Sequence, residues 1–423
     1  MNWILNFLLI GIMIAIAGYW LLMGIFLLQM KASKKKENGE KKILFEPRTA
    51  VLLPIRGADP SLENCVKNIL AQKFKPYSVF FLADNETDPA VQTVRNILKT
   101  SGSEKGNLVI FEKHLPNCSL KCGSLYQMWE RLKDSEFEVF VNVDSDTNPP
   151  PDWLQRLVEP LKNPNIAAAS GLRWYLPENL NGGSVIRQLW NMGAVLQMFF
   201  FQIPWGGSLA VRREVFEDGS LAEIWSRSLT DDTVTTIALQ RIGKKCAILP
   251  SLLLVNREEC SIPAFYPWLK RQLLCVRKYH SSWNFVAFQA LFLGVPVGAA
   301  ILCETGSLFQ EKTNLSVWAI LFLSVWFLGI GTAFWFMDES VRKELRGQGE
   351  KVPQRSWRFM LGSCLLIPAA QLIYLAAAFG NFRMKSVTWR GIQYVLGPKN
   401  SIQMVRYVPY AQINRPLAEN ESL

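Results

Sequence analysis

The sequence predicts an α/β domain with a mostly parallel sheet, preceded by one membrane helix and followed by about three more. Two observations lead to this fold class. Between Phe45 and His280, short runs rich in Val, Phe and Leu alternate with stretches whose apolar residues recur at helical spacing. On either side of this region lie apolar stretches long enough to cross a bilayer, which takes about 20 residues.

The first apolar stretch runs from Trp3 to Met30 without a charged residue. A cleaved secretory signal would have basic residues before a short apolar core and small residues after it, so we expect an uncleaved anchor over residues 1–30. A lysine cluster follows at once and opens a basic linker at 31–44. It indicates that the carboxyl end of the anchor lies in the cytoplasm.

Three further apolar segments, at about 283–303, 315–337 and 359–380, predict membrane helices within residues 281–380. A basic tail follows at 381–423. Four full crossings would put this tail on the side opposite the α/β domain, whereas its basic composition favours the same side. Either the segment from Phe359 re-enters or lies in the interface, or another apolar stretch crosses.

The composition favours a membrane partner over nucleic acid. The chain is 49% hydrophobic and carries 46 Lys+Arg against 35 Asp+Glu, a net charge of +11, which is typical of proteins that bind nucleic acid or membrane surfaces. Its basic residues flank apolar segments and do not interleave with aromatic ones as in single-strand binders. We therefore expect the lipid bilayer as a partner and no nucleic acid.

The eight cysteines show no zinc-site spacing. Most fall in the part expected in the cytoplasm, where thiols stay reduced.

Strands and helices alternate through the expected domain at 45–280. The expected strands are 48–54, 77–83, 108–112 and 138–143, and the expected helices are 62–72, 90–99 and 124–132. A strongly apolar segment at about 184–203 fits a core helix or a helix in the membrane interface. Because ligands bind beyond the carboxyl ends of parallel strands, the residues that follow the strands are the first candidates for a site.

Acidic residues follow two of these strands. Asp84 ends the second expected strand, and Asp144 and Asp146 follow the fourth. Residues two apart on an extended chain point the same way, so this pair could hold one hard divalent cation together with a diphosphate. An isolated Asp-x-Asp is also common in ordinary turns, but Asp84 at the same sheet edge favours a ligand site.

Two later stretches are also candidates. Gly206 and Gly207 follow the apolar segment and could let the backbone approach a ligand closely, although a plain turn fits as well. Asp231 and Asp232 precede an apolar helix that reaches Ile242. This pair could cap the helix or supply a general base for an acceptor hydroxyl.

Together these features resemble the membrane-anchored, inverting nucleotide-sugar glycosyltransferases of the GT-A fold, and within them the ceramide glucosyltransferase branch. The resemblance extends over residues 45–280 and includes the placing of the anchors. It rests on the turn Pro54-Ile55-Arg56-Gly57-Ala58-Asp59-Pro60, on Asp88-Pro89-Ala90, and on the order of Asp84, Asp144 with Asp146, and Asp232.

The resemblance implies a role for each candidate. Asp84 would bind the uridine, and Asp232 would act as the base with support from Asp231. Asp144 and Asp146 would hold Mg²⁺ or Mn²⁺ against the diphosphate. The remaining expected substrate-binding residues are Arg56, Gly206, Gly207, Trp268, Arg271 and Gln272.

One motif departs from the family pattern. Related enzymes carry (Gln/Arg)-x-x-Arg-Trp before their last membrane spans, and this chain has Trp268-Leu-Lys-Arg-Gln272 there. Arg271 matches the family arginine and could neutralise a leaving diphosphate, but a basic face toward lipid headgroups fits as well. In processive polysaccharide synthases the motif helps to hold the acceptor, so its change disfavours such a synthase.

The resemblance thus predicts transfer of a hexose, glucose in this branch, from a UDP-sugar to a hydroxyl of a membrane lipid such as ceramide, with inversion and on the cytoplasmic face. Two alternatives stay open. A processive polysaccharide synthase would need more than about four spans for an obvious polymer channel. The other alternative is a non-catalytic membrane protein, either a scaffold or a transporter, with a degenerate nucleotide-sugar domain. A transporter is disfavoured, because the apolar spans contain no ionisable residue.

Overall fold

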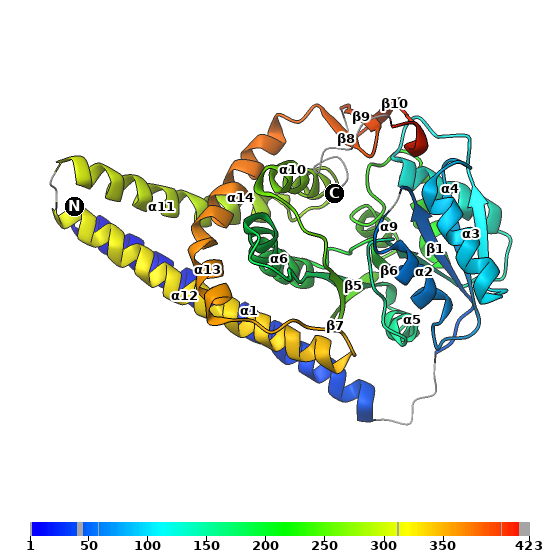
Figure 1. Cartoon of the computed structure of the whole chain (residues 1–423), viewed down its shortest axis with the longest axis horizontal. Coiled ribbons are helices and arrows are strands. Elements are labelled where there is room, and N and C mark those ends of the chain that lie inside the picture. The colour runs from blue at the N-terminus through cyan, green and yellow to red at the C-terminus, as the bar shows by residue number, and fades with distance from the viewer. Residues whose placement is uncertain (1, 40–44, 58, 311–312, 399, 414–423) are drawn as a thin grey trace.

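The computed structural model describes residues 2–39, 45–57, 59–310, 313–398 and 400–413. Part of the expected linker (40–44), Ala58 of the first turn and part of the expected tail (414–423) lie outside the described residues. A sheet domain occupies one end of the molecule, and long helices extend from it (Figure 1).

The main sheet has seven strands in the order β3-β2-β1-β4-β6-β5-β7. Among the described strands of this main sheet only β6 runs antiparallel to its neighbours, so the expected mostly parallel α/β sheet is confirmed. The strands are β1 (Thr49–Ile55), β2 (Tyr77–Ala83), β3 (Gly106–Ile110), β4 (Val139–Val143), β5 (Ile166–Tyr175), β6 (Ser208–Arg212) and β7 (Lys245–Asn256).

Helices cover both faces of this sheet (Figure 1). They are α2 (Leu62–Leu70), α3 (Pro89–Ser101), α4 (Leu120–Leu132), α5 (Trp153–Val158), α7 (Arg213–Glu217), α8 (Leu221–Trp225) and α9 (Thr235–Arg241), with a 3₁₀ turn at Glu159–Lys162. Local sequence sets their ends: in α3, Asp88 accepts a hydrogen bond from the amide of Ala90, Pro89 takes the first position, and Gly102 ends the helix in the left-handed conformation.

Five apolar helices lie before and after the sheet domain: α1 (Asn2–Gly39), α11 (Trp283–Gln310), α12 (Thr313–Gly347), α13 (Trp357–Leu365) and α14 (Ile367–Phe382). In the described part of the chain, α1, α11 and α12 are each long and apolar enough to cross a membrane. The pair α13 and α14, bent by 40°, amounts to one further span at most. The expected N-terminal helix and about three C-terminal apolar helices are therefore confirmed. Helix α1 runs on to Gly39, so the start of the expected linker is helical.

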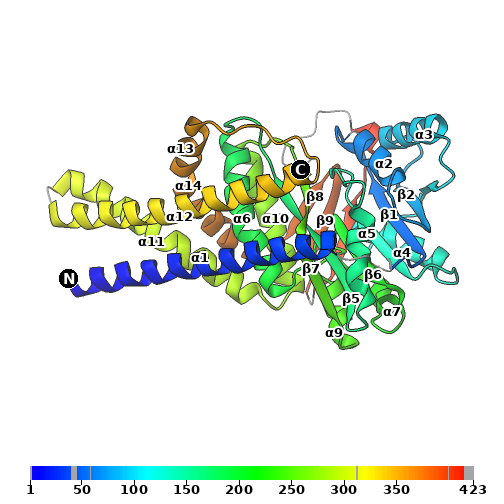
Figure 2. The same ribbon diagram turned by 90° about the horizontal axis from the view of Figure 1, so that it is seen from below.

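The long helices are anchored on the sheet domain through α1, α6 (Gly182–Phe201) and α10 (Ile262–Tyr279). Met23 and Phe26 of α1 are buried in the same apolar cluster as residues of the sheet. Helix α6 contacts β5 and β7 on one side and α1, α10 and α14 on the other. The apolar segment at 184–203 is therefore enclosed by other elements, and half of α6 is buried. Figure 2 shows α1 and α12 extending away from the sheet side by side.

The expected tail contains a second sheet to which the sequence analysis assigned no strands. Strands β8 (Ser386–Trp389), β9 (Ile392–Leu396) and β10 (Ile402–Arg406) pair antiparallel in the order β10-β9-β8. The sheet contacts the main domain, because the amide of Leu120 donates to the Tyr394 hydroxyl at 3.0 Å and the amide of Met404 donates to the Pro116 carbonyl at 2.7 Å. The tail thus lies against the sheet domain, beside the start of α4.

Candidate functional site

A cavity of about 280 Å³ opens at the carboxyl ends of β1, β2 and β4. We call it the site cavity. It is closed by α4, α10 and the C-terminal sheet, and it brings together residues that lie far apart in the sequence. Nine of the sequence candidates line it: Arg56, Asp84, Asp144, Asp146, Asp231, Asp232, Trp268, Arg271 and Gln272.

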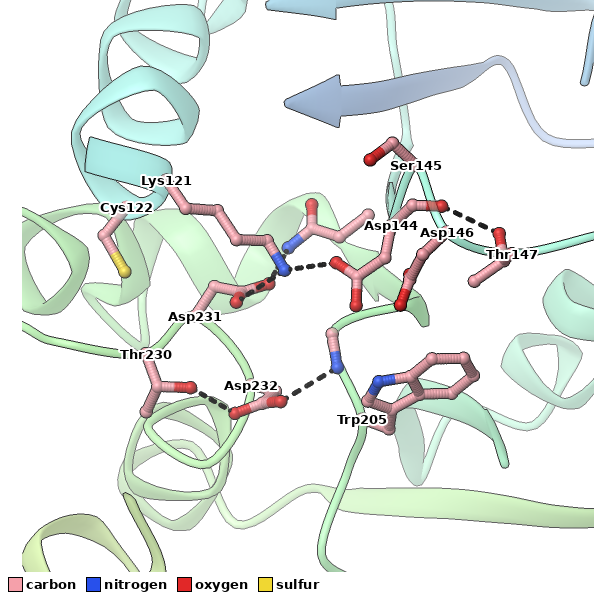
Figure 3. A network of polar contacts seen from close by, with 12 residues as sticks. Lys121, Cys122, Asp144, Ser145, Asp146, Thr147, Trp205, Thr230, Asp231 and Asp232 are labelled. Carbon is pink, nitrogen blue, oxygen red and sulfur yellow. Dashed lines mark hydrogen bonds and ion pairs between the residues drawn. The ribbon is translucent and has the colours of Figure 1, made fainter. Parts of the chain in front are cut away.

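Lys121, at the start of α4, joins two of the candidate carboxylates (Figure 3). Its Nζ lies 2.7 Å from Asp144 Oδ1 and 2.9 Å from Asp231 Oδ1. Burial alone would lower the pKa of Lys121, but these carboxylates raise it above its ordinary value, so the amine stays charged. Lys121 was not among the candidates predicted from the sequence, where its only signal is a lone basic residue in a helix that starts at the sheet edge.

Asp231 is buried, with 3% of its surface exposed. The Asn142 side-chain amide on β4 donates to its Oδ2 at 3.0 Å. Burial raises the pKa of Asp231, and the charge of Lys121 opposes that rise. Asp231 is thus held between a cation and an amide, which suits a positioning residue.

Asp232 is half-buried and accepts three hydrogen bonds. The Gly206 amide donates to its Oδ2 at 3.0 Å, and the Thr233 amide donates to its Oδ1 at 2.6 Å. The Thr230 hydroxyl donates to the same Oδ1 at 2.5 Å (Figure 3). Helix α9 begins only at Thr235 and has no side-chain cap hydrogen bond. The pair therefore does not cap this helix, and Asp232 is oriented at the wall of the site cavity instead.

Asp144 and Asp146 both line the site cavity. The Asn256 side-chain amide donates to Asp146 Oδ2 at 2.8 Å. Burial first, and the nearby charge of Asp144 second, raise the pKa of Asp146 to about 7, against the opposing charge of Arg173. A cation between these carboxylates would relieve their repulsion.

The donor set at this position fits a hard divalent ion. The described residues contain no group of three or more His, Cys, Asp or Glu placed to hold a metal by themselves. Mg²⁺ commonly takes one or two carboxylates and completes its shell with phosphate oxygens and water. Asp144 and Asp146 match that pattern and would hold Mg²⁺ or Mn²⁺ only together with a diphosphate.

The C-terminal segment completes the end of the site cavity around Arg56 and Asp84, both nearly fully buried. The Arg56 guanidinium and the Tyr407 hydroxyl donate to the same oxygen, Asp84 Oδ2, the latter at 2.7 Å. Arg56 Nη2 also donates to the carbonyls of Arg390 at 2.9 Å and Val408 at 2.5 Å.

The other Asp84 oxygen, Oδ1, is buried and has no hydrogen-bond partner among the residues that the structure describes. A buried acceptor without a donor is costly. A ligand N–H or O–H would remove that cost, which agrees with a nucleoside at this end of the cavity.

Helix α10 brings the altered motif to the site cavity, since Trp268, Arg271 and Gln272 all line it. Burial lowers the pKa of Arg271 to about 10, so the guanidinium remains charged at neutral pH. Lys270 and Arg277 instead lie over the rings of Tyr266 and Phe382. Arg271 is thus the residue of this basic helix that contributes its charge to the cavity wall.

Gly206 and Gly207 lie against the carboxylates and do not line the site cavity. A Cβ at Gly206 would come within 2.5 Å of Asp231 Oδ2. One at Gly207 would come within 2.1 Å of the Trp205 ring and 2.7 Å of Asp144 Oδ2. The backbone at these two glycines therefore lies close to the side chains of Asp231 and Asp144.

Besides Lys121, several residues that line the site cavity were not predicted from the sequence. The reason is the same for each: it reaches the site cavity from, or next to, a strand that was not predicted, either in the main sheet or in the tail. They are Arg173 on β5, Glu258 after β7, and Trp389, Arg390 and Tyr394 in the C-terminal sheet.

Two solved structures of glycosyltransferases align with this chain at low sequence identity. A mannosyltransferase from Pyrobaculum calidifontis, solved with GDP-Man and Mn²⁺, aligns with a TM-score of 0.48 at 18% identity, over 90% of this chain and 99% of that one. Glucosyl-3-phosphoglycerate synthase from Mycobacterium tuberculosis, solved with Mn²⁺ and UDP-glucose, aligns with a TM-score of 0.35 at 16% identity, over 60% of this chain and 79% of that one.

No curated protein sequence matches the chain. The sequence model of glycosyl transferase family 21 matches residues 12–402, which include the anchor, the sheet domain, the later helices and most of the C-terminal sheet. The chain therefore belongs to glycosyl transferase family 21.

Proposed function

We propose that this enzyme moves one hexose from a UDP-sugar to a hydroxyl group of a membrane lipid, with inversion at the anomeric carbon. The observation that supports this most is the position of Asp232. Three hydrogen bonds orient its carboxylate at the wall of a cavity that also holds Asp144 and Asp146. One cavity thus offers a base and a diphosphate site.

The donor would lie along the carboxyl edge of the sheet. The free oxygen of Asp84 would accept a hydrogen bond from the nucleoside, and Arg56 holds Asp84 in place. Asp144 and Asp146 would hold Mg²⁺ or Mn²⁺, which when bound supplies charge neutralisation for the leaving UDP. Arg271 adds a fixed positive charge at the same wall.

In the transfer step, Asp232 would take the proton of the acceptor hydroxyl while the hydroxyl oxygen of the acceptor attacks the anomeric carbon. The bond from that carbon to the diphosphate breaks, and UDP leaves. General base catalysis of this kind typically contributes 10²–10⁴-fold to the rate. Asp231 and Lys121 would keep the loop before α9 in position through their ion pair.

We place this site on the cytoplasmic face. Lys31 and Lys34 follow the apolar part of α1, and basic residues at a helix end favour the cytoplasm. If α1, α11 and α12 each cross the bilayer, the chain returns after α12 to the side of the sheet domain. The bent pair α13 and α14 would then be re-entrant, which agrees with the contact of β8–β10 with that domain.

The second candidate is a processive polysaccharide synthase. It shares the carboxylate cluster, but a polymer must leave through the membrane, and the described chain offers three long spans and one bent pair. Trp268 and Gln272 also depart from the motif that holds the acceptor in such synthases.

Purified enzyme in nanodiscs, incubated with a panel of UDP-sugars and fractionated lipid extracts, tests this function. The expected product is a lipid whose mass has increased by one hexose. A ladder of sugar additions would support the synthase, and turnover of no UDP-sugar with any lipid fraction would contradict the proposal.

A further inference from the structure

A second cavity, of about 470 Å³, lies away from the carboxylates, among α1, α6, α11, α12 and α14. We call it the chain cavity. Its walls are almost entirely apolar. Aromatic and aliphatic side chains such as Tyr19, Trp190, Phe292 and Trp326 make up most of them.

Three of its walls are the helices long enough to cross a membrane, which decides what can fill it. Phe285, Phe288 and Phe292 of α11 line the chain cavity and are also 46%, 58% and 41% exposed. On a helix within the bilayer, exposed surface faces lipid tails. The chain cavity is therefore bordered by residues in contact with hydrocarbon.

A pair of indole rings links the chain cavity to the site cavity. Trp190 of α6 lines the chain cavity, and Trp268 of α10 lines the site cavity. The two rings pack edge to face with centroids 5.5 Å apart. At this point the two packed indole rings separate a molecule in the chain cavity from the site cavity.

Two polar atoms of residues in the wall have no hydrogen-bond partner among the described residues. Gln371 of α14 and Trp326 of α12 line the chain cavity, and the Oε1 of Gln371 and the Nε1 of Trp326 are both buried without a hydrogen bond. Nearby, Gln197 and Gln289 bond to each other, and Tyr374 donates to the Val286 carbonyl at 2.9 Å. An unpaired acceptor and an unpaired donor beside hydrocarbon favour a ligand that is apolar but carries both a hydrogen-bond donor and an acceptor.

We propose that the chain cavity binds a long hydrocarbon chain of the acceptor lipid, so that the lipid hydroxyl reaches the site cavity past Trp190 and Trp268. This inference rests on the proposed lipid acceptor and adds where that lipid is held. Burying a chain stabilises binding by roughly a factor of four for each methylene group, so the chain cavity would favour long-chain over short-chain acceptors.

Two glycines allow the chain cavity to be filled without disturbing its walls. Gly18 of α1 and Gly193 of α6 line it, and a Cβ at either position meets no atom within 4 Å. Gly24 of α1 has the same open surroundings but does not line the cavity. The variants Gly18→Leu and Gly193→Leu are therefore tests, and Gly24→Leu is the matched control.

The experiment uses full-length enzyme in phosphatidylcholine nanodiscs with a long-chain ceramide whose acyl chain carries a photoactivatable diazirine. Labelling of α6, α11 and α14 is read by peptide mass spectrometry, and acceptor KM and UDP-sugar hydrolysis are measured in parallel. We expect Gly18→Leu and Gly193→Leu to lose most of the labelling and to raise the KM for the long-chain acceptor at least about tenfold, since a Leu side chain displaces several methylene groups. Hydrolysis of the UDP-sugar by water and all properties of Gly24→Leu should match wild type.

Unchanged labelling and KM in both cavity variants, with lipid product still formed, would overturn this inference alone. If wild type glycosylates neither this ceramide nor any lipid fraction of the panel described above, the proposed function fails whether or not the chain cavity is labelled. Labelling that Gly18→Leu and Gly193→Leu abolish without any change in KM would show a bound lipid other than the acceptor, and would also overturn the inference.

Discussion

Lys121 holds the acidic site together at the residue scale. Its ammonium group forms ion pairs with both Asp144 and Asp231. Removing Lys121 would leave these two carboxylates without this positive charge. Breaking a buried ion pair by removing one partner typically costs about 3–5 kcal/mol. Since Lys121 is partly exposed, its loss should cost the lower part of that range.

We predict that Lys121→Met lowers the free energy of unfolding by about 3 kcal/mol and abolishes transfer. Adding Asp231→Asn should restore part of the stability, because it removes one of the unpaired charges, but should not restore transfer. Thermal unfolding of the detergent-solubilised single and double variants measures this. Equal stability of Lys121→Met and wild type would show that the ion pairs contribute nothing.

The metal prediction concerns Asp144 and Asp146. EDTA should stop transfer, and added Mg²⁺ or Mn²⁺ should restore it, because two carboxylates and a diphosphate together form the oxygen shell. Calorimetry gives a readout independent of turnover: Mn²⁺ should tighten UDP binding to wild type and not to Asp146→Asn. Full activity and unchanged UDP affinity after removal of the metal would exclude this role.

The sequence could reveal the residues that follow strands, and the family resemblance added Asp231, Asp232 and the stretch from Trp268 to Gln272. Asp84, Asp144 and Asp146 were identifiable because parallel strands bring their carboxyl ends to one edge, and Asp232 through the resemblance. Lys121 and Arg390 were not identifiable, since a lone basic residue carries no signal until the fold places it beside a carboxylate.

At the scale of elements, the C-terminal sheet forms one wall of the site cavity and contacts Arg56 and Asp84. It lies more than 300 residues from Asp84 in the sequence, yet Tyr407 donates to that carboxylate and the Arg390 carbonyl accepts from Arg56. We therefore infer that this sheet positions Asp84 for the nucleoside.

Tyr407→Phe removes one hydrogen bond to a charged group, which is worth about 1.5–3 kcal/mol. We predict a rise of about tenfold or more in the KM for the UDP-sugar, with kcat little changed. Tyr410→Phe is the control, because its ring also lies beside Arg56 while no hydrogen bond joins its hydroxyl to the described residues. The same KM in both variants would remove Tyr407 from the donor site.

Element prediction succeeded where the pattern was regular. Strand β2 was predicted at its observed bounds, and β1 and β4 to within one residue at each end. Strands β5, β6 and β7 were missed. Strand β5 contains three Ala and one Gly, and β7 contains Pro250, and both features weaken the strand signal. The small C-terminal strands bury only Ile392, Tyr394 and Ile402 in a cluster of their own, against which Leu120 and Leu229 of the main domain pack.

For the whole molecule, the contact between β8–β10 and the sheet domain bears on the topology that the sequence left open. Because they touch, β8–β10 and the sheet domain must lie on the same side of the membrane. If the N-terminus lies on the opposite side, the chain must cross the membrane an odd number of times. The helices α1, α11 and α12 satisfy this without α13 and α14.

We predict the outcome of protease treatment of sealed vesicles that enclose the cytoplasmic face of the membrane. A tag at the C-terminus and a tag in the sheet domain should both be protected, while a tag between α11 and α12 should be cleaved by external protease. Detergent should expose all three. Cleavage of the C-terminal tag in intact vesicles, with the sheet domain protected, would show that α13 and α14 cross as a fourth span.

The most direct test of lipid glycosylation by base catalysis compares wild type with Asp232→Asn in nanodiscs, following UDP release, lipid product mass and UDP-sugar binding. Wild type should give a lipid heavier by one hexose, and the variant should bind the UDP-sugar as tightly while forming product at least about 10²-fold more slowly. Product formation by Asp232→Asn at more than about a tenth of the wild-type rate would contradict the account.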